Sequence, residues 1–282
     1  MPELPKDLGD QVATALAEDI GSGDVTARLV PETQQVRGRV ITREDAVMCG
    51  QAWVDETFRR LDDTVTLDWH AQDGDRIRID QTLFEIRGSA RPVLTGERTA
   101  LNFLQLLSAT ATQAKRFADA VRGTGCTILD TRKTIPGLRT AQKYAVLCGG
   151  AQNLRIGLYD MVLIKENHIA AAGSIGGAIS AAKQSAPDIR IEVEVESLAG
   201  LEEALASGPD VVMLDNFSIP ETREAVEFTR TRRPGVMLEA SGNVSLDNVR
   251  AIAESGVDYI SVGGITKNIR AVDLSMRLEF TG

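Results

Sequence analysis

The stretch Val211-Val212-Met213-Leu214-Asp215-Asn216-Phe217-Ser218-Ile219-Pro220-Glu221 contains the unit from which the C-terminal half of the chain is built. Its four leading apolar residues are typical of a strand that is buried on both faces, and they end at an acidic residue. Ser218 and Glu221 then have the spacing of a capping box, and Pro220 stands at an early helical position. The stretch therefore predicts a strand that ends in polar residues and leads into a capped helix.

The same unit recurs on both sides of this stretch, at intervals of about 25 residues. Six strands are predicted, at residues 127–129, 161–164, 189–195, 211–214, 236–238 and 259–262. Strands that alternate with helices in this way predict a parallel sheet of the α/β class. An open two-sided sheet fits the rhythm. A barrel fits it better, because each strand has its polar residues at the C-terminal end, where the active sites of barrels assemble.

The first third of the chain has a different pattern. A helix rich in Ala and Leu is predicted at residues 8–18, and residues 36–95 contain short alternating runs that are typical of an antiparallel sheet. A long helix is predicted at residues 97–122, where apolar side chains recur at helical spacing. The chain therefore divides into a smaller sheet domain, a connecting helix and a larger α/β domain.

Composition narrows the class of protein. The chain of 282 residues has a formal net charge of −9 and no Lys/Arg block of five or more, which argues against nucleic-acid binding. No run of about 18 apolar residues is present, so no membrane span is expected, and the N-terminus lacks the features of a secretory signal. Three scattered cysteines predict neither a disulfide framework nor a zinc cluster, and they favour a reduced, cytoplasmic setting.

The polar residues at the strand ends carry the chemistry. A closed barrel would bring together on its rim Arg132, Lys133, Lys165, Glu192, Glu194, Asp215, Glu239 and the turns Ser241-Gly242 and Gly263-Gly264. Arginine binds carboxylates and phosphates in bidentate geometry, and glycine turns that lead into helices cradle phosphates. Carboxylates suit sugar hydroxyls or a magnesium ion shared with phosphates. This set predicts an enzyme site for a small, strongly anionic substrate.

Simpler interpretations of these charges are open at this point. The basic cluster at residues 132–139 is also typical of a solvated turn. The alternating Glu192, Glu194 and Glu196 could form the exposed face of an edge strand. The chain has only two histidines, which argues against a histidine relay or a histidine-based zinc site.

Longer motifs resemble one known family. They are TGERTALN (Thr95–Asn102), DTRKTIPGLR (Asp130–Arg139), LIKENH (Leu163–His168), EVEVE (Glu192–Glu196), MLDNF (Met213–Phe217) and SVGG (Ser261–Gly264). In this order, and over nearly the whole chain, they resemble the quinolinate phosphoribosyltransferases, which are also called carboxylating nicotinate-nucleotide pyrophosphorylases.

The resemblance implies a fold and a reaction. The fold is an N-terminal α/β sandwich at residues 1–108, joined by the tail at residues 270–282, and an incomplete, seven-stranded α/β barrel at residues 109–269. The reaction transfers phosphoribose from phosphoribosyl pyrophosphate to the nitrogen of quinolinate, with pyrophosphate leaving. Loss of carbon dioxide then gives nicotinate mononucleotide, an entry to NAD by the de novo route. Mg²⁺ as cofactor and a homodimer or higher assembly are implied as well.

The resemblance also implies roles for the cations. Arg132, Arg155 and Lys165 would hold the carboxylates of quinolinate. Lys133, a candidate catalytic residue, would lie near both this acid and the pyrophosphate, and Thr131 would be a further contact to substrate.

Other residues are implied to bind the phosphoribosyl group. Glu194 and Asp215, the two other candidate catalytic residues, would bind the ribose hydroxyls and are the protein's candidate contacts to Mg²⁺. Arg98 would reach into the site of a neighbouring subunit. The 5′-phosphate would be surrounded by Ser241, Gly242, Gly263 and Gly264.

One segment departs from the family pattern. The family has Gly-Gly-Gly-x-Asn-His-Arg where this chain has residues 149–155, with Ala151 at the third position and Leu154 in place of the histidine. Leucine offers no hydrogen bond, so a carboxylate there would lose a partner worth roughly 1–3 kcal/mol unless Gln152 compensates. The alternatives are a paralogue with reduced activity or another pyridine acid as substrate, and a non-catalytic phosphometabolite sensor with the same pocket.

Overall fold

The structure, a computed structural model, describes residues 2–281. The chain folds into two compact units, each assembled from separate segments. The first comprises Met1–Lys115, Thr134–Gly150 and Ile265–Gly282, and the second comprises Arg116–Lys133 and Ala151–Gly264. The boundary expected at residues 108 and 109 falls inside one long helix, α3 (Ala90–Ala120). Segments that are distant in sequence therefore build each unit.

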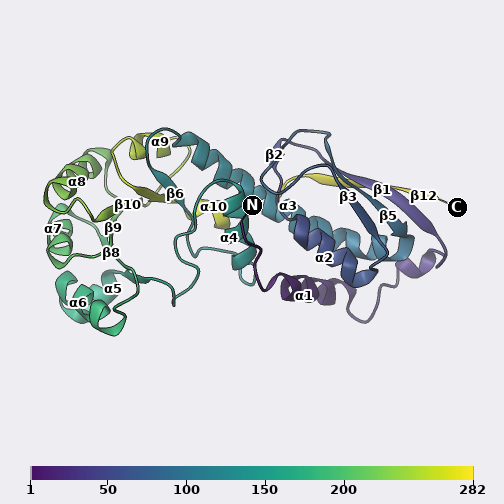
Figure 1. Ribbon diagram of the computed structural model, residues 1–282, viewed down its shortest axis with the longest axis horizontal. Coiled ribbons are helices and arrows are strands. Elements are labelled where there is room, and N and C mark those ends of the chain that lie inside the picture. Colours follow the sequence, from purple (N-terminus) through teal and green to yellow (C-terminus); the bar gives the residue numbers. More distant parts are fainter. Residues whose placement is uncertain (1, 282) are drawn as a thin grey trace. The chain divides into compact units, whose positions relative to one another are not determined.

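The first unit is built on a four-stranded antiparallel sheet with the order β12-β1-β5-β3. Its strands are β1 (Gln35–Thr42), β3 (Thr66–Trp69), β5 (Thr82–Ser89) and β12 (Leu274–Thr281). Apolar side chains of the sheet pack in one buried cluster with those of α3 and α2 (Gln51–Leu61). Figure 1 shows these strands side by side. Since β12 pairs with β1 along its whole length, the C-terminal tail completes the N-terminal sheet.

Shorter elements complete the first unit. They are α1 (Leu8–Ile20), a 3-10 turn (Ala27–Leu29), the strand pair β2 (Ala46–Val47) and β4 (Arg76–Ile77), α4 (Arg139–Cys148), and α10 (Gly264–Lys267), which begins at the unit boundary. The helix predicted at residues 8–18 is confirmed as α1, and the helix predicted at residues 97–122 as part of α3.

The prediction of short strands throughout residues 36–95 is wrong at helix α2. Its N-terminus follows Gly50, which has a φ of +122°. The amides of Gly50 and Gln51 donate to the Asp73 carboxylate at 2.9 and 3.1 Å. A carboxylate in this place satisfies amides that have no partner within the helix. Because Asp73 lies far along the chain, no local signal marks the start of α2.

The second unit contains the predicted parallel sheet, and all six predicted strands are confirmed. They are β6 (Thr127–Leu129), β7 (Val162–Ile164), β8 (Ile191–Val195), β9 (Val211–Asp215), β10 (Met237–Ser241) and β11 (Tyr259–Ser261). Their order in the sheet is β6-β11-β10-β9-β8-β7. The resemblance implies seven strands, and among the described residues Gln152 adds a single parallel bridge to Leu129, beside β6. The second unit therefore has the α/β fold expected from the sequence.

The helices of the second unit are α5 (Glu166–Ala172), α6 (Ile175–Ser185), α7 (Leu198–Ser207), α8 (Ile219–Arg232) and α9 (Val249–Ala253). Figure 1 shows α6, α7 and α8 outside strands β8 to β10. The capping box that opens α8 is present, since Ser218 and Glu221 exchange hydrogen bonds between side chain and backbone. In residues 2–281 no helix is long and apolar enough to cross a bilayer.

Candidate active site

The register of the parallel sheet places the predicted polar side chains on one face. Paired residues of neighbouring strands point to the same side, and side chains alternate along each strand. Glu194 pairs with Met213, which pairs with Glu239, and Ser241 pairs with Asp215. Glu194, Asp215, Glu239 and Ser241 therefore share one face, while the intervening apolar residues face the other way.

Lys165 and Glu194 form an ion pair at the ends of β7 and β8. Lys165 Nζ donates to Glu194 Oε2, and the Glu194 side chain is only 10% exposed while that of Lys165 is 43% exposed. The amide of Lys165 is held by Nδ1 of His168, which fixes the start of α5. A substrate anion that approaches Lys165 must therefore compete with Glu194 for the ammonium group.

Asp215 and Gly242 are organised by Asn216, a residue to which the sequence assigned no role. The side-chain amide of Asn216 donates to Asp215 Oδ2 at 2.8 Å, and its backbone amide donates to the Ser241 carbonyl at 2.9 Å. Gly242 has a φ of +98°, and a Cβ atom there would lie 2.2 Å from Asn216 Oδ1. Only glycine fits this turn, so the Asp215 carboxylate and the Ser241-Gly242 turn are positioned together.

The 131–133 turn lies against Gly263. The Lys133 amide donates to Thr131 Oγ1 at 3.1 Å. A Cβ atom at Gly263 would lie 3.0 Å from Lys133 Cδ and 3.4 Å from Thr131 Oγ1. A side chain at position 263 would therefore press on Lys133. Gly263 therefore lies next to Thr131 and Lys133.

Arg155, which is buried, and Arg132, which is half-buried, differ in the hydrogen bonds that they make. Arg155 is 9% exposed and donates through Nη1 to the Met161 carbonyl at 3.4 Å. Arg132 Nε is buried, and it has no hydrogen-bond acceptor within the described part of the chain. A buried cationic donor without a partner is costly, so Arg132 is suited to an anionic ligand that supplies the acceptor.

The segment that departs from the family pattern is anchored through its backbone. The Leu154 amide donates to Oδ1 of the fully buried Asp130 at 2.9 Å, and the Leu154 side chain is half-buried. Ala151 is buried and the Gln152 side chain is exposed. The hydrogen bond to Asp130 is made by the backbone of residue 154, so it does not depend on the side chain at this position.

Arg98 belongs to the first unit. It lies on α3 and its side chain is exposed. Its assignment to the site of a neighbouring subunit stays a prediction.

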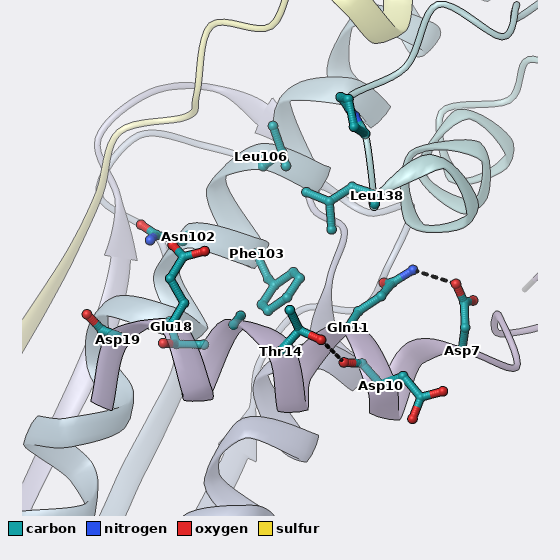
Figure 2. Close-up of a pocket in the computed structure, with 14 residues that line it drawn as sticks. Asp7, Asp10, Gln11, Thr14, Glu18, Asp19, Asn102, Phe103, Leu106 and Leu138 are labelled. Carbon is teal, nitrogen blue, oxygen red and sulfur yellow. Dashed lines mark hydrogen bonds between the residues drawn. The ribbon is translucent and has the colours of Figure 1, made fainter. Parts of the chain in front are cut away.

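A cavity of about 530 Å³ in the first unit lies between α1, α3 and residues 136–138. Figure 2 shows Phe103, Leu106 and Leu138 in the cavity and acidic side chains along α1. Those acids are Asp7, Asp10, Glu18 and Asp19. A wall with this charge repels a dianion, and none of the predicted substrate-binding residues lines it. The cavity is therefore not the site for the anionic substrate.

Glu192 and Glu239 form a buried carboxyl pair below the rim. Both residues are 0% exposed, and within the described residues none of their four carboxyl oxygens has a donor in good hydrogen-bond geometry, although the Ser261 hydroxyl is near enough to lower the pKa of Glu239 in part. Burial raises the pKa of both groups, and the charge of Glu192 raises the pKa of Glu239 further. Arg190 opposes both shifts. Two ionised carboxylates can only accept hydrogen bonds, so this pair is satisfied when one of them keeps a proton.

Replacing Glu239 with glutamine should reduce the stability that the protein loses between acid and neutral pH. The folded protein holds a proton that the unfolded chain releases above the ordinary Glu pKa. Stability is therefore lost as pH rises through the raised pKa of the folded state. Glu239→Gln removes this dependence, which amounts to at most about 1.4 kcal/mol per pH unit for one proton.

Denaturant unfolding between about pH 5 and pH 8 tests this. Glu224→Gln, an exposed change on α8, is the control and should keep the pH dependence of the unchanged protein. Equal pH slopes for Glu239→Gln and the unchanged protein would contradict the shared proton.

Comparisons with known proteins agree with this geometry. Residues 24–108 match the family model described as quinolinate phosphoribosyl transferase, N-terminal domain, and residues 110–277 match that of the C-terminal domain. A nicotinate-nucleotide pyrophosphorylase [carboxylating] of Mycobacterium leprae is 42% identical over 95% of this chain and 96% of its own length. A probable enzyme of the same name from Bacillus subtilis is 39% identical over 92% of this chain and 89% of its own length.

Solved structures give the same result. The nicotinate-nucleotide pyrophosphorylase of Francisella tularensis superposes with a TM-score of 0.94 at 45% identity, over 98% of each chain. The corresponding structure from Ehrlichia chaffeensis gives a TM-score of 0.93 at 37% identity, over 99% of this chain and 100% of the other. The similarity therefore extends over both units and not only over the parallel sheet.

Proposed function

Because the chain belongs to the quinolinate phosphoribosyltransferase family, we propose that it transfers phosphoribose from phosphoribosyl pyrophosphate to the nitrogen of quinolinate. Pyrophosphate leaves in this step, and the adduct loses carbon dioxide to give nicotinate mononucleotide. The reaction feeds NAD biosynthesis. The assignment of the site rests on Arg132 Nε, which is a buried cationic donor with no acceptor in residues 2–281. A carboxylate of quinolinate would supply this acceptor.

The cations of the site bind the acid and assist its decarboxylation. Arg132, Arg155 and Lys165 would neutralise the two carboxylates of quinolinate, which lowers the cost of bringing a dianion next to a pyrophosphate. When carbon dioxide leaves, its bonding electron pair stays on the ring carbon beside the new cationic nitrogen. The same side chains, already fixed in place, would stabilise that negative charge. Lys133 would lie between the acid and the departing pyrophosphate.

The carboxylates bind the sugar. Glu194 and Asp215 would accept hydrogen bonds from the ribose hydroxyls and stabilise the positive charge that develops on the ribose ring as pyrophosphate leaves. Thr131 would be a further contact to substrate. The 5′-phosphate would lie against Ser241, Gly242, Gly263 and Gly264, where glycine leaves room for backbone amides to approach.

Mg²⁺ fits the same donors. Glu194 and Asp215 offer carboxylate oxygens from one face of neighbouring strands, and Mg²⁺ prefers oxygen ligands shared between one or two carboxylates and substrate phosphates. We propose that these two residues hold it together with pyrophosphate oxygens. When bound, the ion neutralises charge on the leaving pyrophosphate.

The expectation of a cytoplasmic setting, drawn from the three scattered cysteines, stays a prediction.

The choice of acceptor tests the proposal. Pyrophosphate release would be measured with the purified chain, Mg²⁺, phosphoribosyl pyrophosphate, and quinolinate, nicotinate or nicotinamide. We expect release with quinolinate alone, because two carboxylates are needed to engage Arg132, Arg155 and Lys165 together. Release with nicotinate at a similar rate, or no release with quinolinate above that of heat-inactivated protein, would refute it.

We also propose that a homodimer is the active unit and that Arg98 of one chain completes the site of the other. The exposure of Arg98 on α3 supports this. Mixing inactive Arg98→Ala and Arg132→Ala proteins should restore activity, since a mixed dimer has one site with both arginines. No recovery on mixing, with subunit exchange shown independently, would place both arginines in the same chain's site.

Replacing Leu154 with histidine is expected to lower KM for quinolinate about fivefold, because a new hydrogen bond to a carboxylate contributes about 1 kcal/mol. The bond from the Leu154 amide to Asp130 should hold the main chain in place in the variant. Steady-state rates with varied quinolinate would be compared with those of Leu154→Ala, which removes bulk without adding a donor. If both variants leave KM unchanged or raise it, the position does not face the acid.

A further inference from the structure

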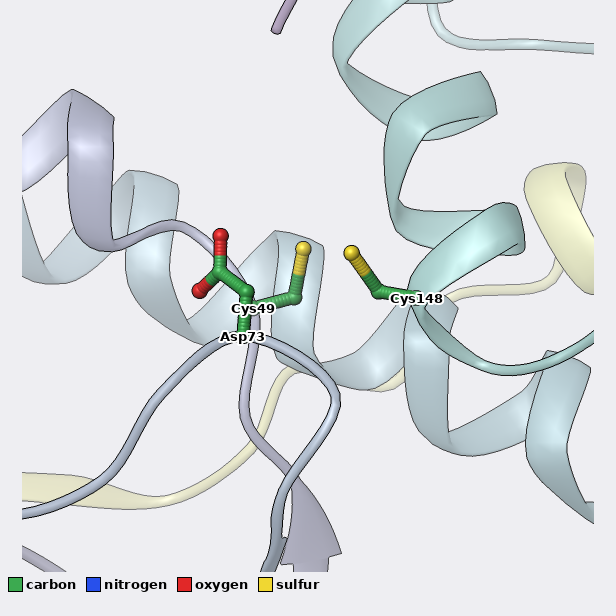
Figure 3. Close-up of side chains that lie close together, drawn as sticks. All are labelled: Cys49, Asp73 and Cys148. Carbon is green, nitrogen blue, oxygen red and sulfur yellow. The ribbon is translucent and has the colours of Figure 1, made fainter. Parts of the chain in front are cut away.

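Three side chains of the first unit converge in a second cluster, outside the proposed substrate site. Cys49 Sγ, Cys148 Sγ and a carboxylate oxygen of Asp73 all lie within 4.8 Å of one another. Figure 3 shows the two sulfur atoms facing each other, with the Asp73 carboxylate beside Cys49. Cys49 lies between β2 and α2, Asp73 lies between β3 and β4, and Cys148 ends α4. The cysteines are scattered in sequence, so only the fold brings them together.

The Asp73 carboxylate is fixed from three sides. Its Oδ1 accepts from the amides of Gly50 and Gln51, and its Oδ2 accepts from the Tyr144 hydroxyl at 2.8 Å. Such outer hydrogen bonds orient carboxylates that bind metals. Oδ1 uses both of its lone pairs in these bonds, whereas Oδ2 keeps one, so the group is able to act as a ligand through Oδ2.

Cys49 is held equally firmly. Its amide donates to Ser108 Oγ at 3.0 Å, and the Ser108 hydroxyl donates back to the Cys49 carbonyl at 3.1 Å. The Cys49 side chain is fully buried, whereas Cys148 is partly exposed. One thiol of the cluster is therefore rigid and enclosed, and the other can be reached from solvent.

The groups around these sulfurs are acids. Burial raises the pKa of the Cys49 thiol well above its usual value, and Cys148 and Asp73 raise it further. Burial, and then the charge of Asp73, also raise the pKa of Tyr144. A cation would relieve this accumulation of acidic groups, and a divalent cation deprotonates the thiols that bind it.

We propose that Cys49, Asp73 and Cys148 form a site for a thiophilic divalent cation of the Zn²⁺ class, with water in the fourth position. Binding forms two metal–sulfur bonds and one metal–oxygen bond, and the two thiol protons are released to solvent. Zn–S bonds are about 2.3 Å long, so ligand atoms already this close need only small side-chain movements to close on the ion. Thiolate and carboxylate ligands in tetrahedral geometry suit Zn²⁺ better than Mg²⁺.

The ion would join three segments of the first unit. It would link the start of α2, the β3–β4 turn and the end of α4. Cys148 directly precedes Gly149, which packs so closely on α3 that a Cβ atom there would lie 2.4 Å from the Ala111 carbonyl oxygen. The site would therefore anchor the point from which the chain continues to residues 151–155, and metal binding should stabilise the first unit.

A disulfide between the two cysteines is the alternative that the facing sulfurs raise. A disulfide would join only the two sulfur atoms, whereas a cation would bind all three groups that lie within 4.8 Å of one another. The convergence of the Asp73 carboxylate on the two sulfurs therefore favours the cation.

Titration of the full-length, reduced and metal-free protein with Co²⁺ in the absence of oxygen tests the site. Thiolate ligands give Co²⁺ an intense near-ultraviolet band that oxygen ligands, including those proposed for Mg²⁺, do not give. We expect the band to saturate at one ion per chain, to disappear when Zn²⁺ is added, and to weaken as pH falls, because protons compete for the thiolates.

Variants locate the ligands. Cys148→Ser should lower the band intensity by about half and weaken binding at least about tenfold, and Asp73→Asn should weaken binding while keeping two thiolates. Cys126→Ser changes a buried cysteine of the second unit and is the matched control, which should bind as the unchanged protein does. Unfolding midpoints measured without metal show whether each variant folds.

Three results would overturn the proposal. The first is that no band forms although all cysteines of the protein are reduced, as shown by their reaction with a thiol reagent after unfolding. The second is a band that Cys148→Ser leaves unchanged. The third is a Cys49–Cys148 disulfide, detected as the loss of two hydrogen masses, in protein purified without added oxidant.

Discussion

Replacing Arg132 with alanine is expected to lower kcat/KM for quinolinate by about 10²–10³-fold, because truncating one partner of a buried charge pair costs about 2–5 kcal/mol. Arg132 Nε is buried, and no acceptor for it lies within residues 2–281. The quinolinate carboxylate that supplies this acceptor would in the variant be buried with one cation fewer. Initial rates with varied quinolinate at saturating phosphoribosyl pyrophosphate measure the loss.

Two further variants make the Arg132 result specific. Arg132→Lys keeps the charge but loses the planar pair of donors, so its kcat/KM should lie between those of the alanine variant and the unchanged enzyme. Arg223→Ala removes an exposed arginine from α8 and should change kcat/KM little. If Arg132→Ala reduces kcat/KM no more than Arg223→Ala does, Arg132 does not bind the acid.

Replacing Glu194 with glutamine is expected to lower kcat by about 10²–10³-fold, because the variant loses a fixed charge aimed at the positive charge of the transition state. Quinolinate binding should change in the opposite direction. Lys165 pairs with Glu194 in the structure, so quinolinate must displace this carboxylate to reach the ammonium group. A neutral glutamine competes less, and the dissociation constant of quinolinate should fall or stay the same.

Rates and calorimetric binding of quinolinate separate these two effects. Glu196→Gln changes the exposed glutamate two positions along the chain and should alter neither quantity. A general loss of structure would weaken binding together with kcat. A Glu194→Gln protein with normal kcat, or with binding weakened more than tenfold, would contradict the assigned role.

Local patterns along the chain were sufficient to predict the parallel sheet. Each strand is a short apolar run, and features such as the Ser218–Glu221 capping box mark where a helix starts. The same patterns put Lys165, Glu194, Asp215 and Ser241 at strand ends, and the register then places Glu194, Asp215 and Ser241 on one face. The family motifs added the reaction, which no spacing of residues could supply.

What the sequence could not predict depends on contacts between distant residues. Helix α2 is capped by Asp73, which follows it by more than ten positions, so only strands were predicted in residues 36–95. Glu192 looked like one of several rim carboxylates, and the structure instead buries it beside Glu239, where burial raises the pKa of both carboxyl groups. Cys49 and Cys148 looked scattered and meet only after folding.

We propose that this chain joins phosphoribose to quinolinate and removes one carboxylate in the same site. The most direct test uses quinolinate labelled in the carboxylate at C2, next to the ring nitrogen, and follows released carbon dioxide together with nicotinate mononucleotide. We expect equal amounts of both products, formed only when phosphoribosyl pyrophosphate is present, and loss of both in Arg132→Ala. A mononucleotide that keeps the label, or no product above that of heat-inactivated protein, would contradict it.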